Sequence, residues 1–327
     1  FLNNFGECVN KKGEKCMQQS SKKKKWTKTY IKKWLPIFIL GLPGLIYVFI
    51  NNYMPMYGLQ IAFKDFRYDL GIAGSPWCGF DNFKYLFATK DAFIITRNTI
   101  LYNLAFIIID VVVGVAMGIF LNEIRGKAAK KVYQTLILLP YLMSMVVVSY
   151  LTYAFIGDRT GMLNMILNFF GMKSIRFYST QTYWPFILTF VNQWRRIGYG
   201  SIIYLSTIVG LGDAYYEAAE LDGATKWQQI KYITLPLIRP TIIMLVTISM
   251  GQIFRSDFGL FYQVPRNQGM LYNVTDTIDT YVFRALLQAG DIGLSSAAAF
   301  YQSIVCFITI MIFNTIINKI SPEDALF

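Results

Sequence analysis

The stretch YYEAAELDGATKWQQIKYITLPLIRP, residues 215–240, is a polar segment between two long apolar runs. Its first part is rich in Ala and Glu, which favours a helix, and Asp213 precedes it as the predicted N-cap. Gly223 interrupts this helix and permits a sharp bend. The run ATKWQQIKYI predicts a second short helix, and Pro236 suits the first turn of the next one, where a missing N–H costs little. The stretch therefore predicts two short helices set at an angle.

The composition around this stretch is that of an integral membrane protein. Of the 327 residues, 54% are hydrophobic and 15% are charged, against about 25% charged residues in a soluble protein. The formal net charge is +12, and ten of the 31 lysines and arginines precede Trp34. We interpret residues 1–33 as a basic cytoplasmic tail whose charge fixes the orientation of the chain. No basic domain with interleaved aromatic residues accompanies the tail, which argues against nucleic-acid binding.

Six apolar runs are long enough to cross a membrane as helices. They are 34–56, 92–122, 132–157, 183–210, 236–263 and 296–318. With the N-terminus in the cytoplasm, more than half of the lysines and arginines lie on the inner side, together with the loop 211–235 and the C-terminus. The outer stretches 79–87 and 161–172 predict short amphipathic helices. We therefore predict an all-α integral membrane fold with six transmembrane helices in one domain, 34–327.

The residues that most enzymes and metal sites use are scarce. The chain has no histidine, and its four cysteines have no spacing typical of a disulfide framework or a zinc site. It also lacks a phosphate-binding loop of the form G-x-x-x-x-G-K-[ST], because RGKAAK at 125–130 has neither the first glycine nor the Ser or Thr. We expect no catalytic residues, no metal site and no ATPase site in this chain.

The polar stretch also carries a longer pattern. It reads Glu-Ala-Ala, three residues, Gly, nine residues, Ile-x-Leu-Pro, beginning at Glu217 and ending at Pro236. This pattern resembles the cytoplasmic-loop signature of permease subunits of bacterial ATP-binding-cassette importers, in the version found in the sugar-uptake branch. The motifs GFDNFKYLF, NTILYNL, LLPYLMS, QWRRIGYGSIIYLS and NKISPEDALF look like those of its oligosaccharide and polysaccharide subgroup. The likeness covers nearly the whole chain after about Lys32.

The resemblance implies a type I importer permease fold whose cytoplasmic coupling helix, about 211–235, docks on a separate ATPase. That cytoplasmic subunit dimer would bind the ATP and Mg, so this chain itself would need no cofactor. The other implied partners are a homologous second permease, an extracellular or periplasmic solute-binding protein, membrane lipid and a carbohydrate. The implied location is the bacterial cytoplasmic membrane, with both termini in the cytoplasm. The implied coupling residues are Glu217, Ala218, Ala219, Asp222, Gly223, Ala224, Trp227, Leu235 and Pro236.

Polar residues inside the last three predicted spans are the candidates for substrate contact, because such residues usually face a cavity or each other. They are Asn192, Gln193, Trp194, Arg195, Arg196, Gln252, Arg255, Asp257, Tyr262, Tyr301 and Gln302. Amides and charges suit sugar hydroxyls, and aromatic faces suit the C–H side of a sugar ring. Structural pairing between helices is the other interpretation of the same residues. The excess of arginine over aspartate in this set suggests an acidic saccharide. Asp110 in the second span is a further buried charge, interpreted as a helix-packing partner.

Other functions stay open from the residues alone. An importer of the same kind could carry a non-sugar solute. An ion-coupled secondary transporter more often has internal repeats and an isolated intramembrane carboxylate, and Asp110 and Asp257 keep that alternative open. A membrane-embedded enzyme would need a carboxylate pair, metal ligands or a nucleophile with its base at the membrane face. The acidic cluster of Glu217, Glu220 and Asp222 lies within the loop signature instead.

Overall fold

The computed structural model describes residues 28–88 and 90–320, and in these ranges the chain forms helices and no strand. The chain divides into two compact units, Phe1–Gly58 and Leu59–Phe327, and each is described on its own. Most of the predicted basic tail, 1–33, lies outside the described residues.

The first unit consists of helix α1 (Lys28–Val48) and the π-helix η1 (Phe49–Tyr53). The 3-10 helix η2 (Met54–Phe63) follows directly and runs on into the second unit. The predicted run 34–56 overlaps Leu35–Phe63, a helical stretch long and apolar enough to cross a membrane. Pro36 and Pro43 lie inside α1, as is tolerated in membrane helices.

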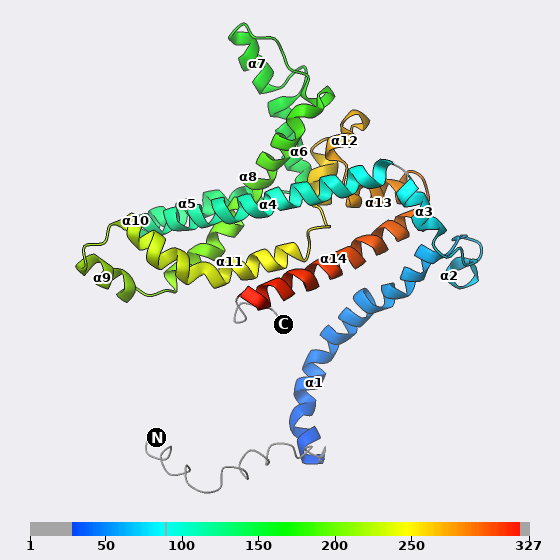
Figure 1. Ribbon diagram of the computed structural model, residues 1–327, viewed down its shortest axis with the longest axis horizontal. Coiled ribbons are helices and arrows are strands. Elements are labelled where there is room, and N and C mark those ends of the chain that lie inside the picture. The colour runs from blue at the N-terminus through cyan, green and yellow to red at the C-terminus, as the bar shows by residue number, and fades with distance from the viewer. Residues whose placement is uncertain (1–27, 89, 321–327) are drawn as a thin grey trace. The chain divides into compact units, whose positions relative to one another are not determined.

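The second unit holds the remaining helices (Figure 1). In chain order they are α2 (Gly71–Gly74), α3 (Asp81–Ala88), α4 (Lys90–Glu123), α5 (Lys127–Leu142), α6 (Met145–Ile156), α7 (Met162–Phe169), η3 (Phe177–Ser179), η4 (Gln181–Tyr183), α8 (Trp184–Val209), α9 (Ala214–Leu221), α10 (Lys226–Gln229), η5 (Ile230–Thr234), α11 (Leu235–Met250), η6 (Gly259–Gln263), η7 (Gly269–Leu271), α12 (Tyr272–Thr275), α13 (Ile278–Leu287) and α14 (Ile292–Ile320). The predicted short helices at 79–87 and 161–172 are confirmed as α3 and α7.

The described part of the chain has four straight helical stretches able to cross a membrane, and up to six spans if two bent helix pairs each count as one. The third predicted span, 132–157, is not straight: α5 and α6 meet at an angle of 96°. Pro140 lies near the end of α5, and the Ser144 hydroxyl accepts a hydrogen bond from the Val147 N–H at the start of α6. A proline followed by a new N-cap explains why the helix stops and restarts here. The other bent pair is α8 and α9, at 70°.

The fifth predicted span, 236–263, is wrong at both ends. Helical structure runs without interruption from Lys226 through α10, η5 and α11 to Met250, so the second short helix is the beginning of this span. Pro236 lies in the first turn of α11, as predicted. Beyond Met250 the chain leaves the helix, and regular structure resumes only at η6. We call residues 251–258 the break.

The helices of the second unit pack through small residues and an aromatic core. Helix α8 lies along α4 and α5. A side chain added at Gly198 of α8 would clash with the Ile137 carbonyl of α5, at 2.2 Å, so glycine permits this close approach. The fully buried Trp184 and Leu260 belong to a core that joins the start of α8 to η6. Figure 1 shows α9 and α10 at one end of α4, and α3 and α13 at the other.

Candidate functional site

A polar cavity of about 370 Å³ lies between α4, α8 and the break. Tyr141 of α5 contributes to its wall. The lining residues are Asn103, Phe106, Ile107, Asp110, Tyr141, Asn192, Arg195, Arg196, Ser249, Gln252, Arg255, Ser256 and Asp257. A smaller cavity of about 100 Å³ shares Asp110 and Arg196 with it and is lined also by Gln193. We call the larger cavity the polar pocket.

Buried polar atoms without hydrogen-bond partners gather at these two cavities. Six such side-chain atoms occur among the described residues, and five of them are Asp110 Oδ1, Asn192 Nδ2, Gln193 Nε2, Gln193 Oε1 and Arg195 Nε. A buried polar group left unpaired costs about 1–3 kcal/mol, and such groups are rare in folded proteins. Their concentration here indicates a site built to receive water or a polar ligand.

The charges that line the polar pocket have a positive excess. The Arg195 guanidinium lies 3.0 Å from the Asp257 carboxylate, and Arg195 also lies near the face of Tyr141, 5.9 Å from the ring centroid. Asp257 accepts a further hydrogen bond from the Leu260 N–H, which fixes the start of η6. Arg196 and Arg255 are exposed. With Asp110 as the other carboxylate of the lining, three arginines face two aspartates.

The break presents its side chains to the pocket because other helices hold its backbone. Asn103 Nδ2 of α4 donates to the carbonyls of Ile253 and Arg255, each at 2.8 Å. Gln302 Nε2 of α14 donates to the Phe254 carbonyl at 2.7 Å. Non-helical backbone at membrane depth is tolerated only where protein or a water-filled cavity satisfies it. Discontinuous helices of this kind are where many transporters bind substrate.

The structure brings together about half of the predicted substrate-pathway residues. Those that line the polar pocket are Asn192, Arg195, Arg196, Gln252, Arg255 and Asp257, and Gln193 lines the smaller cavity. The other four lie elsewhere. Trp194 lines an apolar groove of about 760 Å³ between α6, α7 and α8. Tyr262 stacks on Phe258, and Tyr301 packs on Phe87. Gln302 does not line the pocket but donates a hydrogen bond to the backbone of the break.

Sequence reasoning missed four polar lining residues, namely Asn103, Tyr141, Ser249 and Ser256. It noted Asp110 without assigning it to a ligand site. A signal for Asn103 existed, because Asn103, Ile107 and Asp110 follow the spacing of one helix face. All three line the pocket.

The predicted coupling segment forms an exposed turn between α9 and α10. Gly223 has φ +77°, a conformation that favours glycine, and so makes the predicted bend. Thr225 begins α10 with a capping box: its hydroxyl accepts from the Gln228 N–H, and the Gln228 side chain accepts from the Thr225 N–H. Asp213 is the N-cap residue of α9, as predicted, but its side chain makes no capping hydrogen bond. Thr225 supplies the side-chain cap of this segment, one helix later.

Most of the predicted coupling residues are exposed. Ala219 and Ala224 are half-buried, and the exposed ones are Glu217, Ala218, Asp222, Gly223, Trp227, Leu235 and Pro236. The apolar side chains of Leu221 and Trp227 are 90% and 71% exposed, which is typical of a surface that a partner covers. An ion pair of 2.7 Å between Glu220 and Lys226 spans the bend.

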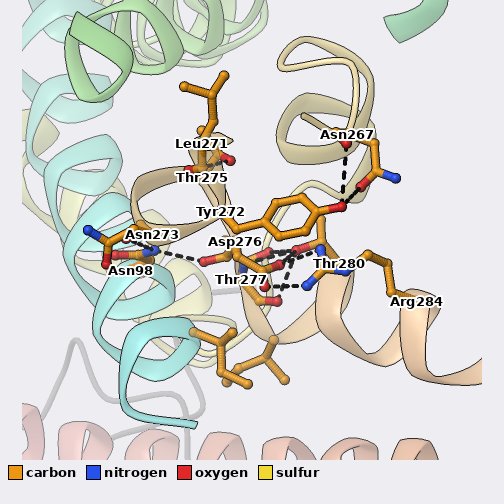
Figure 2. Close-up of polar contacts among 12 residues, drawn as sticks. Asn98, Asn267, Leu271, Tyr272, Asn273, Thr275, Asp276, Thr277, Thr280 and Arg284 are labelled. Carbon is orange, nitrogen blue, oxygen red and sulfur yellow. Dashed lines mark hydrogen bonds and ion pairs between the residues drawn. The ribbon is translucent and has the colours of Figure 1, made fainter. Parts of the chain in front are cut away.

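A third group of polar residues lies at the opposite end of α4. We call Tyr272, Asp276, Thr277, Thr280 and Arg284 the outer polar cluster (Figure 2). Asp276 is buried and forms a two-pronged ion pair with Arg284, whose guanidinium lies 4.0 Å from the Tyr272 ring centroid. Burial lowers the pKa of Arg284, but the hydrogen bond and charge of Asp276 raise that pKa above its usual value. Arg284 therefore keeps its positive charge in this part-buried position.

Comparisons with known proteins place these features in context. The model of the family described as "binding-protein-dependent transport system inner membrane component" matches residues 110–321. The polygalacturonan/rhamnogalacturonan transport system permease protein YteP of Bacillus subtilis is 32% identical, over 88% of this chain and 89% of YteP.

Two solved structures are also similar. One is a bacterial ABC transporter involved in the import of the acidic polysaccharide alginate. The match has a TM-score of 0.82 and 31% identity, and covers 90% of this chain and 98% of that chain. The other is a bacterial alginate ABC transporter in complex with an alginate pentasaccharide-bound periplasmic protein. It has a TM-score of 0.81 and 30% identity, and covers 90% and 97%.

Proposed function

Because the chain belongs to the family of binding-protein-dependent transport system inner membrane components, we propose that it forms half of the translocation pathway of an ATP-driven importer for acidic oligosaccharides. As a family member it is a multi-pass membrane permease subunit without an ATPase site. The observation that carries the substrate proposal is the polar pocket, with its unpaired polar atoms and its excess of arginine.

The chemistry of the pocket suits a chain of uronic acids. Arg255 and Arg196 can each bind a carboxylate through paired, charge-assisted hydrogen bonds. The amides of Asn192 and Gln252 suit ring hydroxyls, and the Tyr141 ring suits the C–H face of a sugar. Two of the similar proteins support this class, since one is named for polygalacturonan and another for the acidic polysaccharide alginate.

The partner subunits of the importer are proposed from the exposed coupling segment and from membership of the family. We propose that residues 211–235 are a cytoplasmic coupling helix that docks on an ATPase dimer, which binds the ATP and Mg. Glu217 then pairs with a basic residue of that ATPase. A homologous second permease completes the pathway, and an external solute-binding protein delivers the saccharide, as the complex of the alginate transporter suggests. ATP binding drives an alternating-access cycle of the spans.

This assignment fixes the proposed topology. The six spans are Leu35–Phe63, α4, the α5–α6 pair, α8, the run Lys226–Met250 and α14. The coupling segment follows α8, so that end of α4 is cytoplasmic, and the outer polar cluster faces outside. Both termini are then cytoplasmic, and the chain lies in a bacterial cytoplasmic membrane as the single domain 34–327 behind its basic tail.

The test is uptake by the assembled transporter in liposomes, with uronic-acid oligomers compared with neutral oligomers of equal length. We expect wild type to carry the acidic series. Arg255→Gln removes one charge-assisted contact, worth about 1.5–3 kcal/mol, so acidic uptake should fall about tenfold or more. Arg266→Gln is the matched control, because Arg266 lies over the Tyr153 ring and does not line the pocket. Transport of neutral oligomers with none of the acidic series would refute the proposal.

A further inference from the structure

A carboxylate that does not line the polar pocket accepts hydrogen bonds from the break. Asp279 of α13 accepts three hydrogen bonds on one oxygen, Oδ2. The donors are the Ser256 N–H at 2.6 Å, the Ser256 hydroxyl at 2.8 Å and Gln302 Nε2 at 3.1 Å. Hydrogen bonds to an ionised acceptor are roughly twice as strong as neutral ones. Asp279 thus ties the middle of the break to α13 and α14.

Ser256 stands between the two charged residues of the break that line the pocket. Its neighbours Arg255 and Asp257 both line the pocket, as Ser256 itself does. Asn103 holds the Arg255 carbonyl from the α4 side, and Asp279 holds the following N–H from the α13 side. The peptide unit that joins Arg255 to Ser256 is therefore clamped at its carbonyl and at its N–H. This clamp sets the direction in which the Arg255 side chain leaves the backbone.

A continuous series of polar contacts runs from this clamp to the outer polar cluster. The Ser256 hydroxyl lies 2.7 Å from the Thr277 hydroxyl, and the Thr280 hydroxyl donates to Asp276 at 2.5 Å. Asn98 Nδ2 of α4 donates to the Asp276 carbonyl at 2.9 Å, as Figure 2 shows. The start of α13, which carries Asp279, is thereby fixed to α4, the helix that also supplies Asn103. Both sides of the clamp therefore rest on α4.

We propose that Asp279 is a positioning residue for the transported saccharide, acting through Ser256 to orient Arg255 and Asp257 in the polar pocket. The proposal rests on the proposed function only for the identity of the saccharide. Capping or stabilising helix α13 does not account for the hydrogen bonds that Asp279 accepts. The start of α13 is capped by Thr277 and Thr280, and the bonds that Asp279 Oδ2 accepts come from the break and from α14.

The experiment uses Asp279→Asn in the assembled transporter in lipid nanodiscs and liposomes. Asp291→Asn is the matched control, since Asp291 is an exposed carboxylate that caps the start of α14. The first readout is amide hydrogen exchange over 251–258. We expect about tenfold faster exchange in Asp279→Asn and no change in the control, because the Ser256 N–H loses a charged acceptor. The second readout is the ratio of acidic to neutral oligomer uptake.

A positioning role predicts that this ratio falls about tenfold in Asp279→Asn. A merely structural role predicts that both uptake rates fall in proportion. In the double variant with Ser256→Ala, the ratio should fall no further than in Asp279→Asn alone, because the hydroxyl that Ser256→Ala removes is one of the three donors to Asp279 Oδ2.

Unchanged exchange over 251–258 would overturn the proposal whatever the saccharide. Faster exchange with a constant uptake ratio, or a double variant with additive effects, would overturn it as well. If wild type carries only neutral oligomers, the proposed substrate class fails. The exchange data and the change in selectivity among neutral oligomers would then still decide the role of Asp279.

Discussion

Arg195 and Asp257 show how single residues settle the chemistry of the polar pocket. They come from α8 and from the break, and their side chains are 20% and 32% exposed. An ion pair in this position is partly desolvated, so each partner depends on the other more than in a surface pair. Their pairing also leaves Arg255, Arg196 and Asp110 as the other charged residues that a saccharide meets.

Removal of one partner should therefore cost more than removal of both. We expect Arg195→Gln to leave the Asp257 carboxylate uncompensated and to lower the free energy of unfolding by about 1–3 kcal/mol. The double variant with Asp257→Asn should recover part of this loss. Thermal unfolding of the purified chain measures both values. Lys226→Gln, which breaks the exposed pair with Glu220, is the control and should cost much less than Arg195→Gln, because water screens an exposed pair. Strictly additive losses would contradict a direct interaction.

At the residue scale the sequence reveals which residues are charged, but it does not reveal in which direction each side chain points. Arg195, Arg255 and Asp257 were predicted because a charge inside an apolar run is visible without a structure. Trp194 was grouped with its neighbour Arg195, yet successive helical residues point about 100° apart, and Trp194 faces the apolar groove. Asn103 was missed because a neutral amide does not stand out in such a run. Its role depends on carbonyls about 150 residues away, which no local pattern encodes.

At the scale of elements, the contact between α8 and α5 depends on one glycine. A Cβ at Gly198 would meet the backbone of Ile137 at 2.2 Å, whereas a Cβ at Gly200 would meet nothing within 4 Å. The two positions lie in the same helix and have the same helix propensity. They are therefore a matched pair for separating packing from propensity.

Gly198→Ala should force α8 away from α5 and destabilise the chain by about 1–3 kcal/mol. Gly200→Ala should be neutral or stabilising by a few tenths to about 1 kcal/mol, since alanine is the better helix former. Thermal unfolding in the same detergent compares the two variants. Equal melting temperatures would show that α5 and α8 do not approach as closely as described.

Apolar run lengths predicted the helical elements but not their interruptions. All six runs correspond to helical stretches because about 20 apolar residues in a membrane have few alternatives to a helix. The 96° bend after Leu142 does not lower the apolarity of its run, and the polar residues after Met250 do not by themselves reveal that the helix ends there. The bend and the break persist because side chains such as Ser144, Asn103 and Gln302 satisfy the freed backbone groups. Those partners are known only once the helices are packed.

At the scale of the whole second unit, the predicted docking segment and the outer polar cluster lie at opposite ends of α4 (Figure 1). The polar pocket is lined by α4 between these ends. A movement imposed on α9 and α10 can reach the pocket through α8, which packs against α4. The resemblance of residues 217–236 to a family signature predicted this segment, and its bend at Gly223 is confirmed.

Reversal of the charge at Glu217 should separate ATP hydrolysis from transport. Glu217 is exposed on α9, so Glu217→Lys should leave the fold intact while it repels the basic residue proposed on the ATPase. In the assembled transporter we expect uptake to fall about tenfold or more, which corresponds to the loss of roughly 1.4 kcal/mol or more of coupling free energy, while ATP hydrolysis continues. Asp69→Lys is the control, an exposed carboxylate outside the coupling segment. Normal uptake in Glu217→Lys would rule out this coupling role.

The break after Met250 also bears on how permeases of this kind could acquire new cargo. In an unbroken helix, a side chain that faces the pathway also packs against its neighbours one turn away, so each exchange disturbs the span. Across 251–258 the peptide groups rest on Asn103 and Gln302 instead, and the exposed side chains of Gln252 and Arg255 carry no helical packing. Evolution can therefore alter these two positions at little cost to folding. A library randomised at 252 and 255 is the place to search for importers of other saccharides.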